Sequence, residues 1–274
     1  MKYMHFNSSC SYTALAMLLE EKGISTEDTE IALEIGLPWI FDRREDSFLA
    51  GPNLQGAEWF DIYLNPRGLR MLEESIDAEG VPDYLVEHGQ CMLGIRLPGN
   101  NGKHAVVFHG YDGSYRFYNP VHEGSGASAE LVLGKEELMQ ALDRETMVGS
   151  LIRCAKNRHD MRPVFERSVS VLRENLKEIE GFSGTVHEPD EYRDAMDRLF
   201  RPLLLDGISM LKLAGETDLA GRLETVQREF LHFLKGDRSA ALADNISLDS
   251  LRDCAGEYIR LIERHIKGDT GDKQ

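Results

Sequence analysis

One cysteine in this sequence has surroundings that suit chemistry. Cys10 lies in the segment NSSCSYTALAMLLEEKGI, between small polar residues and an apolar run that predicts a helix over residues 10–22. Backbone N–H groups at the start of a helix stabilise an anion, and they can therefore lower the pKa of a thiol in the first turn. Cys10 is a candidate nucleophile.

The other cysteines lie in apolar segments and are expected to be small buried side chains. Cys91 and Cys154 fall in the strand-like runs QCMLGIRL and SLIRCA, and Cys254 falls on the apolar face of a predicted helix. No two cysteines have the close spacing of a zinc site, and no histidine pair is spaced i, i+4 on a helix. We therefore expect neither a metal nor another cofactor.

A thiol nucleophile needs an imidazole that takes and returns a proton, and a third group that orients this imidazole. The segment KHAVVFHGYDGSYRFYNP supplies both, because Asp112 begins a tight turn that predicts a hairpin. His104 starts the first strand and Asn119 ends the second, so both lie at the open end of the hairpin. His109 is the competing base, on the opposite face, and Asp112 is a second candidate for the orienting group.

The periodicity of the chain predicts two regions. Helices are expected over residues 10–22 and 67–79, followed from about residue 85 by short strands of an antiparallel sheet, which is an α+β pattern. Beyond Asn157 the apolar period becomes 3.6, and four amphipathic segments predict a helical bundle with a kink at Pro202. The expected domains are residues 1–157 and 158–268, with a disordered tail over 269–274.

The chain is acidic, with a net charge of −16, of which −11 belongs to residues 1–157. This charge disfavours binding to nucleic acid and to anionic membranes. Around a cleft it would favour cationic or amine-bearing substrates; elsewhere it is only a solvated surface. The sequence shows neither a signal peptide nor an apolar stretch that could span a bilayer, and a cytoplasmic location is expected.

These motifs resemble the papain-like superfamily. A cysteine that opens a long first helix, then HAVVFHGYD, a hairpin and FYNP, is similar to the peptidase domains of bacteriocin-processing ABC transporters and to the amino-terminal domain of butirosin-biosynthesis acyltransferases. The resemblance covers about residues 1–155. It implies a papain-like domain before the helical bundle, a triad of Cys10, His104 and Asn119, and acyl groups on an acyl carrier protein as donors. The peptidase branch usually has Asp in the third place.

The same resemblance bears on the oxyanion hole. The peptidase branch has Gln six residues before the cysteine, where this chain has Met4. Asn7 can supply a side-chain N–H beside the backbone N–H of Cys10, or it can cap the helix instead. His5 is also near enough in sequence to reach the site.

A long segment rich in Gly, Pro and aromatic residues, residues 36–68, separates the first predicted helix from the sheet. Such segments are often binding loops or lids. Trp39, Phe41, Trp59 and Phe60 are candidates to line a cleft beside Cys10; alternatively, each ring packs under the loop.

The leading hypothesis is a thiol-dependent acyl-transfer enzyme, either hydrolase or acyltransferase, acting on a small-molecule or peptide acyl substrate. Cys10 attacks the carbonyl, His104 acts as base and then as acid, and Asn119 orients His104. The alternative is a catalytically inactive papain-like module that binds a ligand. For the helical region, covering the substrate and forming a homo-oligomer are both open; in the inactive module it would be a surface for a partner or for dimerisation.

Overall fold

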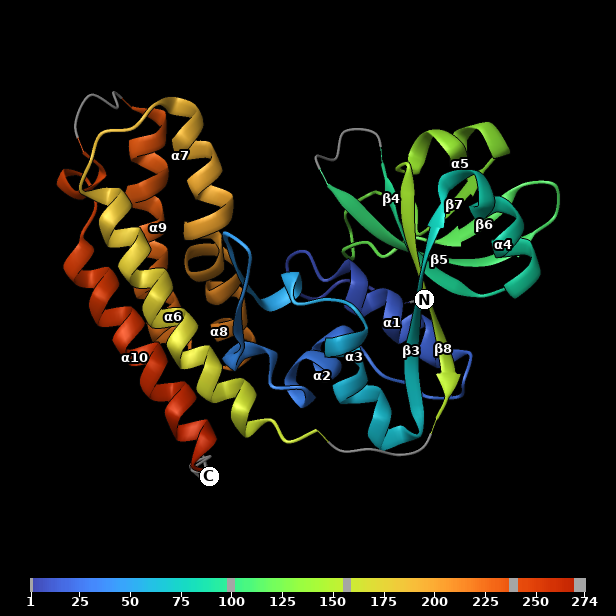
Figure 1. Ribbon diagram of the computed structural model, residues 1–274, viewed down its shortest axis with the longest axis horizontal. Coiled ribbons are helices and arrows are strands. Elements are labelled where there is room, and N and C mark those ends of the chain that lie inside the picture. The colour runs from blue at the N-terminus through green and yellow to red at the C-terminus, as the bar shows by residue number, and fades with distance from the viewer. Residues whose placement is uncertain (1, 98–101, 155–158, 237–240, 269–274) are drawn as a thin grey trace. The chain divides into compact units, whose positions relative to one another are not determined.

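The chain divides into two compact units, seen in a computed structural model that describes residues 2–97, 102–154, 159–236 and 241–268 (Figure 1). The first unit comprises Met1–Ile35 and Gln55–His159, and the second comprises Gly36–Leu54 and Asp160–Gln274. The sequence predicts that residues 36–54 belong to the first domain. This prediction is wrong, because these residues pack with the helices of the second unit. The predicted tail, residues 269–274, lies outside the described residues.

The first unit is a mixture of helices and an antiparallel sheet, as the α+β pattern predicts. The strands follow the order β3-β8-β4-β5-β6-β7, and every neighbouring pair is antiparallel. The helices are α1 (Cys10–Glu20), α2 (Asp28–Glu34), α3 (Ala57–Leu64), α4 (Val81–His88) and α5 (Lys135–Ala141). The strands are β3 (Leu69–Asp77), β4 (Cys91–Arg96), β5 (Lys103–Tyr111), β6 (Tyr115–Tyr118), β7 (Glu130–Leu133) and β8 (Glu145–Arg153).

The helix predicted over residues 67–79 is wrong, because this segment forms strand β3. Its residues LRMLEESID include good helix formers, yet they pair with β8 along the full length of the strand, from Leu69 opposite Arg153 to Asp77 opposite Glu145. Leu69 and Met71 are buried whereas Arg70 between them is exposed, which is the alternation of a strand. Pairing with a distant strand therefore overrides the local helix propensity.

Other elements pack on both faces of the sheet at strand β5. Leu93, Val106 and Phe108 point to one face and pack with Leu85 of α4 and Leu138 of α5 in a single apolar cluster. Strand β5 also packs against α1, and Val107, which points to the opposite face by alternation, is fully buried. The strand that carries His104 is thus fixed on both sides.

The second unit is a helical bundle with a small hairpin. Its helices are α6 (Arg162–Ser183), α7 (Pro189–Ala195), α8 (Ile208–Leu213), α9 (Thr217–Lys235) and α10 (Leu248–Ile266). Strands β1 (Phe41–Arg44) and β2 (Ser47–Ala50) form the antiparallel hairpin, which packs on α6. Within the described ranges, no helix is both long enough and apolar enough to cross a bilayer.

The predicted kink at Pro202 takes the form of wider helical turns. The chain between α7 and α8 has π-helical geometry over Met196–Phe200 and Pro202–Gly207. Proline has no N–H and widened turns leave carbonyl groups without their usual donors. Two side-chain amides supply donors: Asn175 Nδ2 donates to the carbonyl of Leu199 at 2.9 Å, and Gln227 Nε2 donates to that of Leu204.

A buried carboxyl in the same region makes the stability of the second unit pH-dependent. Asp206 is 1% exposed, and burial raises its pKa to about 6 although Arg201 and Asn53 hydrogen-bond to it. Between an unfolded pKa of about 4 and this value the folded state binds more protons, so stability falls as pH rises.

We expect the free energy of unfolding to fall by on the order of 2 kcal/mol across that pH window relative to Asp206→Asn. Urea unfolding at pH 4 and pH 7 measures it, with Trp39 as the reporter of the second unit in a Trp59→Phe background. Equal pH slopes in both proteins would contradict the assignment.

Candidate active site

Helix α1 begins at Cys10, after a turn with unusual backbone geometry. Ser8 has a φ of 58°, in the left-handed region that non-glycine residues rarely occupy, and Ser9 is fully buried. The N–H of Thr13 donates to the carbonyl of Ser9 at 2.9 Å, which starts the helix. The turn places the half-buried Cys10 thiol at the helix N-terminus, as the sequence predicts.

His104 and Asn119 are brought together at the open end of the β5–β6 hairpin. His104 is the second residue of β5, and Asn119 directly follows β6. The Nε2 atom of His104 lies 2.8 Å from Oδ1 of Asn119. Asn119 is 4% exposed, and its own Nδ2 donates to the carbonyl of Ser128 at 2.6 Å. This second bond orients the amide so that its oxygen faces the imidazole, which must then carry its proton on Nε2.

The thiol of Cys10, at the start of α1, contacts strand β5 at the residue that follows His104, because the backbone N–H of Ala105 hydrogen-bonds to its sulfur. The backbone N–H groups of Ala105, Ser11 and Cys10 lower its pKa, but burial has a larger effect and leaves the pKa raised. The expected lowering of this pKa is therefore wrong for the resting protein, because the loss of hydration outweighs the helix terminus. Ala105 directly follows His104, so the hydrogen bond from its N–H places the sulfur beside the strand position of the imidazole.

Burial also sets the charge of the imidazole. It lowers the pKa of His104, whereas Asn119 and the backbone of Pro120, which both favour the protonated imidazole, oppose this effect. A histidine with a lowered pKa is neutral at pH 7 and can accept a proton. The two shifts together describe a neutral thiol at the start of α1 and a neutral imidazole on β5.

The competing histidine and carboxylate do not join this group. His109 lies at an irregularity in the pairing of β5 and β6, stacks on Tyr118 at 4.0 Å, and has Nε2 3.4 Å from a carboxylate oxygen of Glu130. Asp112 accepts hydrogen bonds from Arg116, which lower its pKa. Both side chains contact partners other than Asn119: His109 contacts Tyr118 and Glu130, and Asp112 contacts Arg116.

The structure excludes one of the two roles expected of Asn7. Asn7 is exposed, and the N-cap of α1 is Ser9, so Asn7 does not occupy the cap position. It stays a candidate oxyanion donor. At the position of the peptidase glutamine, Met4 pairs with the segment after Asn119: its N–H donates to the carbonyl of Val121 at 2.9 Å.

The aromatic candidates in the first unit belong to its core. Phe60 is 1% exposed and packs edge-on against Tyr12 of α1, with ring centroids 5.4 Å apart. Trp59 is 8% exposed, and its Nε1 atom has no hydrogen-bond partner among the described residues. The prediction that Phe60 lines a cleft is therefore corrected, because its ring has no exposed surface to offer a substrate.

The aromatic candidates of the 36–54 segment pack within the second unit. Phe41 is 2% exposed and lies edge-on to Tyr258, with centroids 5.2 Å apart. Trp39 is half-buried and contacts the rings of Tyr258 and His265. Packing, the alternative left open by the sequence, accounts for Phe41, and we assign neither ring to a cleft beside Cys10.

The remaining cysteines have structural surroundings. Cys91 is fully buried, and burial raises its pKa to about 12; Cys254 is 1% exposed. Cys154, expected to be buried, is half-buried, with Sγ 3.5 Å from Oδ1 of Asn65. In the part of the chain that the structure describes, no group of three or more His, Cys, Asp or Glu side chains could hold a metal ion.

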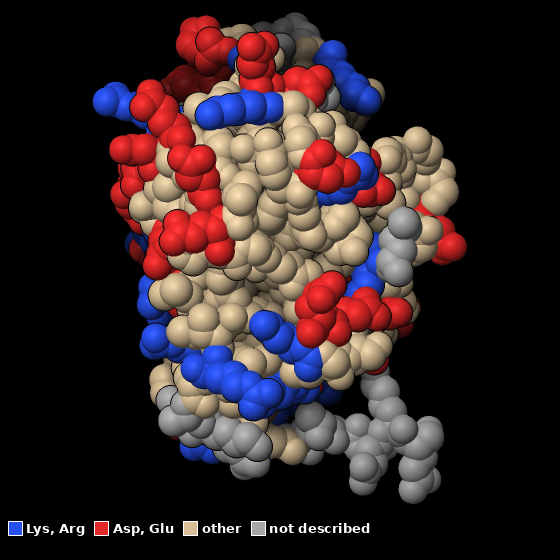
Figure 2. Space-filling model, turned by 90° about the vertical axis from the view of Figure 1, so that its right-hand side faces the viewer, with Lys and Arg blue, Asp and Glu red and all other residues tan. Residues whose placement is uncertain are grey.

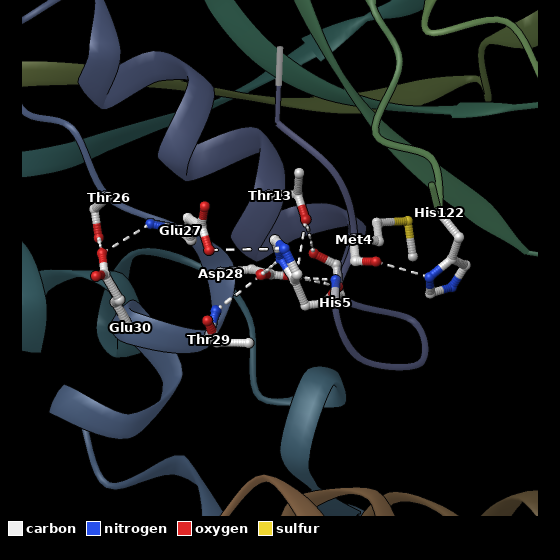
Figure 3. A network of polar contacts seen from close by, with 10 residues as sticks. Met4, His5, Thr13, Thr26, Glu27, Asp28, Thr29, Glu30 and His122 are labelled. Atoms are coloured by element: carbon white, nitrogen blue, oxygen red, sulfur yellow. Dashed lines mark hydrogen bonds and ion pairs between the residues drawn. The ribbon is translucent and has the colours of Figure 1, made fainter. Parts of the chain in front are cut away.

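A buried carboxylate that sequence reasoning missed supports the turn before Cys10. Asp28, the first residue of α2, is 1% exposed and accepts hydrogen bonds from residues on both sides of the cysteine (Figure 3). In the sequence it looks like an ordinary acidic residue in the first turn of a helix. No local pattern indicates that it is buried.

The acidic excess of the first unit does not form a continuous acidic surface on the face seen in Figure 2. There, acidic side chains follow the upper left edge and form another group at the lower right, basic side chains gather at the lower left and also occur near the top, and a broad uncharged area lies between these groups. Charge on this face is therefore mixed, and it does not by itself indicate a cationic substrate.

Comparison of the sequence with models of known protein families and with curated proteins finds no match. A thiol at a helix start, a neutral imidazole on the adjacent strand and an amide that fixes the tautomer can together form and break an acyl–sulfur bond.

Proposed function

We propose that the first unit is a papain-like cysteine enzyme that catalyses acyl transfer. The observation that carries the proposal is the 2.8 Å contact between His104 and Asn119, next to the residue whose N–H binds the Cys10 sulfur. His104 and Asn119 lie 15 residues apart, at the open end of one hairpin, and the contact between them is the one that a triad requires.

In the proposed reaction, the sulfur of Cys10 attacks the carbonyl carbon of a thioester, ester or amide. Nδ1 of His104 takes the thiol proton, and a tetrahedral oxyanion forms. When this collapses, the leaving group departs with the proton from His104, and the acyl group stays on Cys10 as a thioester. Water or an amine then attacks this thioester, gives its proton to His104, and releases the thiol of Cys10.

Asn119 acts by fixing the tautomer of His104. Because its oxygen accepts the Nε2 proton, Nδ1 keeps a lone pair for the thiol proton. The bond from Asn119 to the carbonyl of Ser128 keeps the amide from rotating.

The acyl donor is proposed as a class only. Small-molecule and peptide acyl compounds both fit the chemistry, and an acyl group on a carrier protein is one donor to test. The second unit is a candidate for covering the substrate or for joining two copies of the chain.

A second candidate function is a papain-like module that binds a ligand without turnover. The raised pKa of Cys10 favours it, because a buried neutral thiol is less reactive than a thiolate. The two functions differ in one observable, a covalent acyl group on Cys10.

The test is acylation by S-acyl N-acetylcysteamine thioesters, followed by intact mass and peptide mapping. We expect the wild type to gain one acyl group on Cys10, and Cys10→Ala to gain none. We expect Asn119→Ala to acylate about 10- to 100-fold more slowly, the loss of one buried hydrogen bond, and Asn119→Asp to retain more of the rate. Absence of an adduct from thioester, ester and amide donors alike would favour the binding module.

A further inference from the structure

The carboxylate of Asp28 accepts hydrogen bonds from residues before and after Cys10 and from the start of α2. Its Oδ2 atom accepts from the N–H of His5 at 2.8 Å, from Ser9 Oγ at 2.6 Å and from Thr13 Oγ1 at 3.2 Å (Figure 3). Its Oδ1 atom accepts from His5 Nδ1 at 2.7 Å and from the N–H of Thr29 at 2.8 Å. The hydroxyl of Thr13 shares its one proton with the carbonyl of Ser9, at 3.1 Å, and the other four donors already fill a carboxylate, which has about four lone-pair sites.

These hydrogen bonds come from residues on both sides of Cys10 in the sequence. Ser9 directly precedes Cys10, Thr13 lies one turn beyond it on α1, and His5 starts the turn that leads to it. The turn also contains Ser8 in its left-handed conformation, which costs conformational energy and persists only where its surroundings impose it. Asp28 supplies that constraint from another element, α2.

The segment that leads to Cys10 also contacts the chain that follows Asn119. Residues 4–9, here termed the N-terminal strap, run from the chain after Asn119 to the start of α1. At one end the N–H of Met4 donates to the carbonyl of Val121, and His122 Nδ1 donates to the carbonyl of Met4 at 2.8 Å (Figure 3). At the other end His5 and Ser9 bind Asp28.

We infer that Asp28 is a positioning residue for Cys10, and that through the N-terminal strap it sets the place of the thiol relative to the segment that carries Asn119. The inference rests on the proposed acyl-transfer function. A displacement of the nucleophile by about 1 Å can cost about 100-fold in rate, and so loss of this anchor is expected to act on the chemical step.

Asp28→Asn tests the inference with little change of shape. The amide can still accept from Thr29 and His5 Nδ1, but its NH₂ group then faces the His5 N–H, donor against donor. Ser9→Ala is a milder second variant, since it removes only the 2.6 Å bond and keeps the carboxylate. Asp61→Asn is the matched control, because Asp61 accepts from the N–H of Met71 at 2.6 Å in the same unit and contacts neither the strap nor α2 in any hydrogen bond described.

The measurement is the acylation of Cys10 at increasing thioester concentration. We expect Asp28→Asn and Ser9→Ala to lower the saturating rate constant by about 10- to 100-fold. The half-saturating donor concentration and the final fraction of Cys10 acylated are expected to stay unchanged. That fraction counts folded protein, so a purely structural defect would lower it and leave the rate constant unaltered. Unchanged rate constants in both variants, or an equal loss in Asp61→Asn, would overturn the inference.

A failure of the proposed function gives a different result. If the wild type accepts no acyl donor, the inference is judged by hydrogen exchange of residues 5–9 and by the iodoacetamide rate at Cys10. Faster exchange and an altered rate in Asp28→Asn, with Asp61→Asn like the wild type, would support the positioning role. Identical behaviour of all three proteins would overturn it.

Discussion

Replacement of His104 by alanine is expected to slow the acylation of Cys10 by about 100- to 10,000-fold, the usual contribution of a positioned general base. The thiol of Cys10 is neutral at rest because burial raises its pKa, and its attack therefore requires a base that takes the proton. The lowered pKa of His104 keeps that base unprotonated at pH 7. The rate of adduct formation with S-acyl N-acetylcysteamine, followed by mass spectrometry, measures the effect.

His109→Ala is the matched control, because it removes a histidine from the same strand. His109 stacks on Tyr118 and approaches Glu130, and it makes no described hydrogen bond to Asn119. We expect its removal to change the acylation rate less than about threefold, the effect of a modest local change in packing. Equal losses of rate in the two variants would mean that the contact with Asn119 does not determine which histidine acts as the base.

Phe60→Ala is expected to lower the free energy of unfolding of the first unit by about 3 to 5 kcal/mol, as for other buried aromatic truncations. The ring is 1% exposed and packs edge-on against Tyr12, which is fully buried in α1 two residues after Cys10. Its removal leaves a cavity beneath the helix that begins at Cys10. Urea unfolding followed by Trp59 fluorescence, in a Trp39→Phe background, measures the loss in this unit.

Val86→Ala provides the comparison, since Val86 is 53% exposed in the same unit and its truncation should cost less than about 0.5 kcal/mol. If Phe60 instead lined a substrate cleft, Phe60→Ala would leave stability intact and raise the half-saturating donor concentration. That outcome would mean that Phe60 lines a substrate cleft, which its burial argues against.

The parts of the fold that local patterns determine could be predicted from the sequence. The turn at Asp112 lies between β5 and β6, α1 starts at Cys10, and the helix around Pro202 changes its geometry there. Turn chemistry, helix starts and proline all act within a few residues. For this reason the open end of the hairpin, with His104 and Asn119, could be located before the structure was known.

The parts that depend on distant partners could not be predicted. Strand β3 has a helix-favouring sequence, and only its pairing with β8 makes it a strand. Residues 36–54 adjoin the first unit in sequence, yet Phe41 is buried against Tyr258 of α10. Asp28 has the same local pattern as an exposed helix-start acid. In each case the deciding contact is many residues away, where periodicity carries no information.

The same limit applies to the electrostatics of the site. The helix start at Cys10 could be inferred, and it does act on the thiol, since the N–H groups of Ser11 and Cys10 lower its pKa. The larger, opposite effect of burial depends on how the sheet and helices pack around the sulfur. The direction of the pKa shift of the Cys10 thiol was therefore predicted wrongly, while its place at the start of a helix was predicted correctly.

The pH dependence of iodoacetamide alkylation at Cys10, in the wild type and in His104→Ala, tests the central claim most directly. We predict that the wild-type rate rises as His104 loses its proton, below its ordinary pKa of about 6.5, and stays high to pH 8. In His104→Ala the rate should rise only in the alkaline range, where the buried thiol itself ionises. Superimposable profiles in the two proteins would show that the imidazole does not act on the thiol, and would contradict a Cys10–His104 catalytic pair.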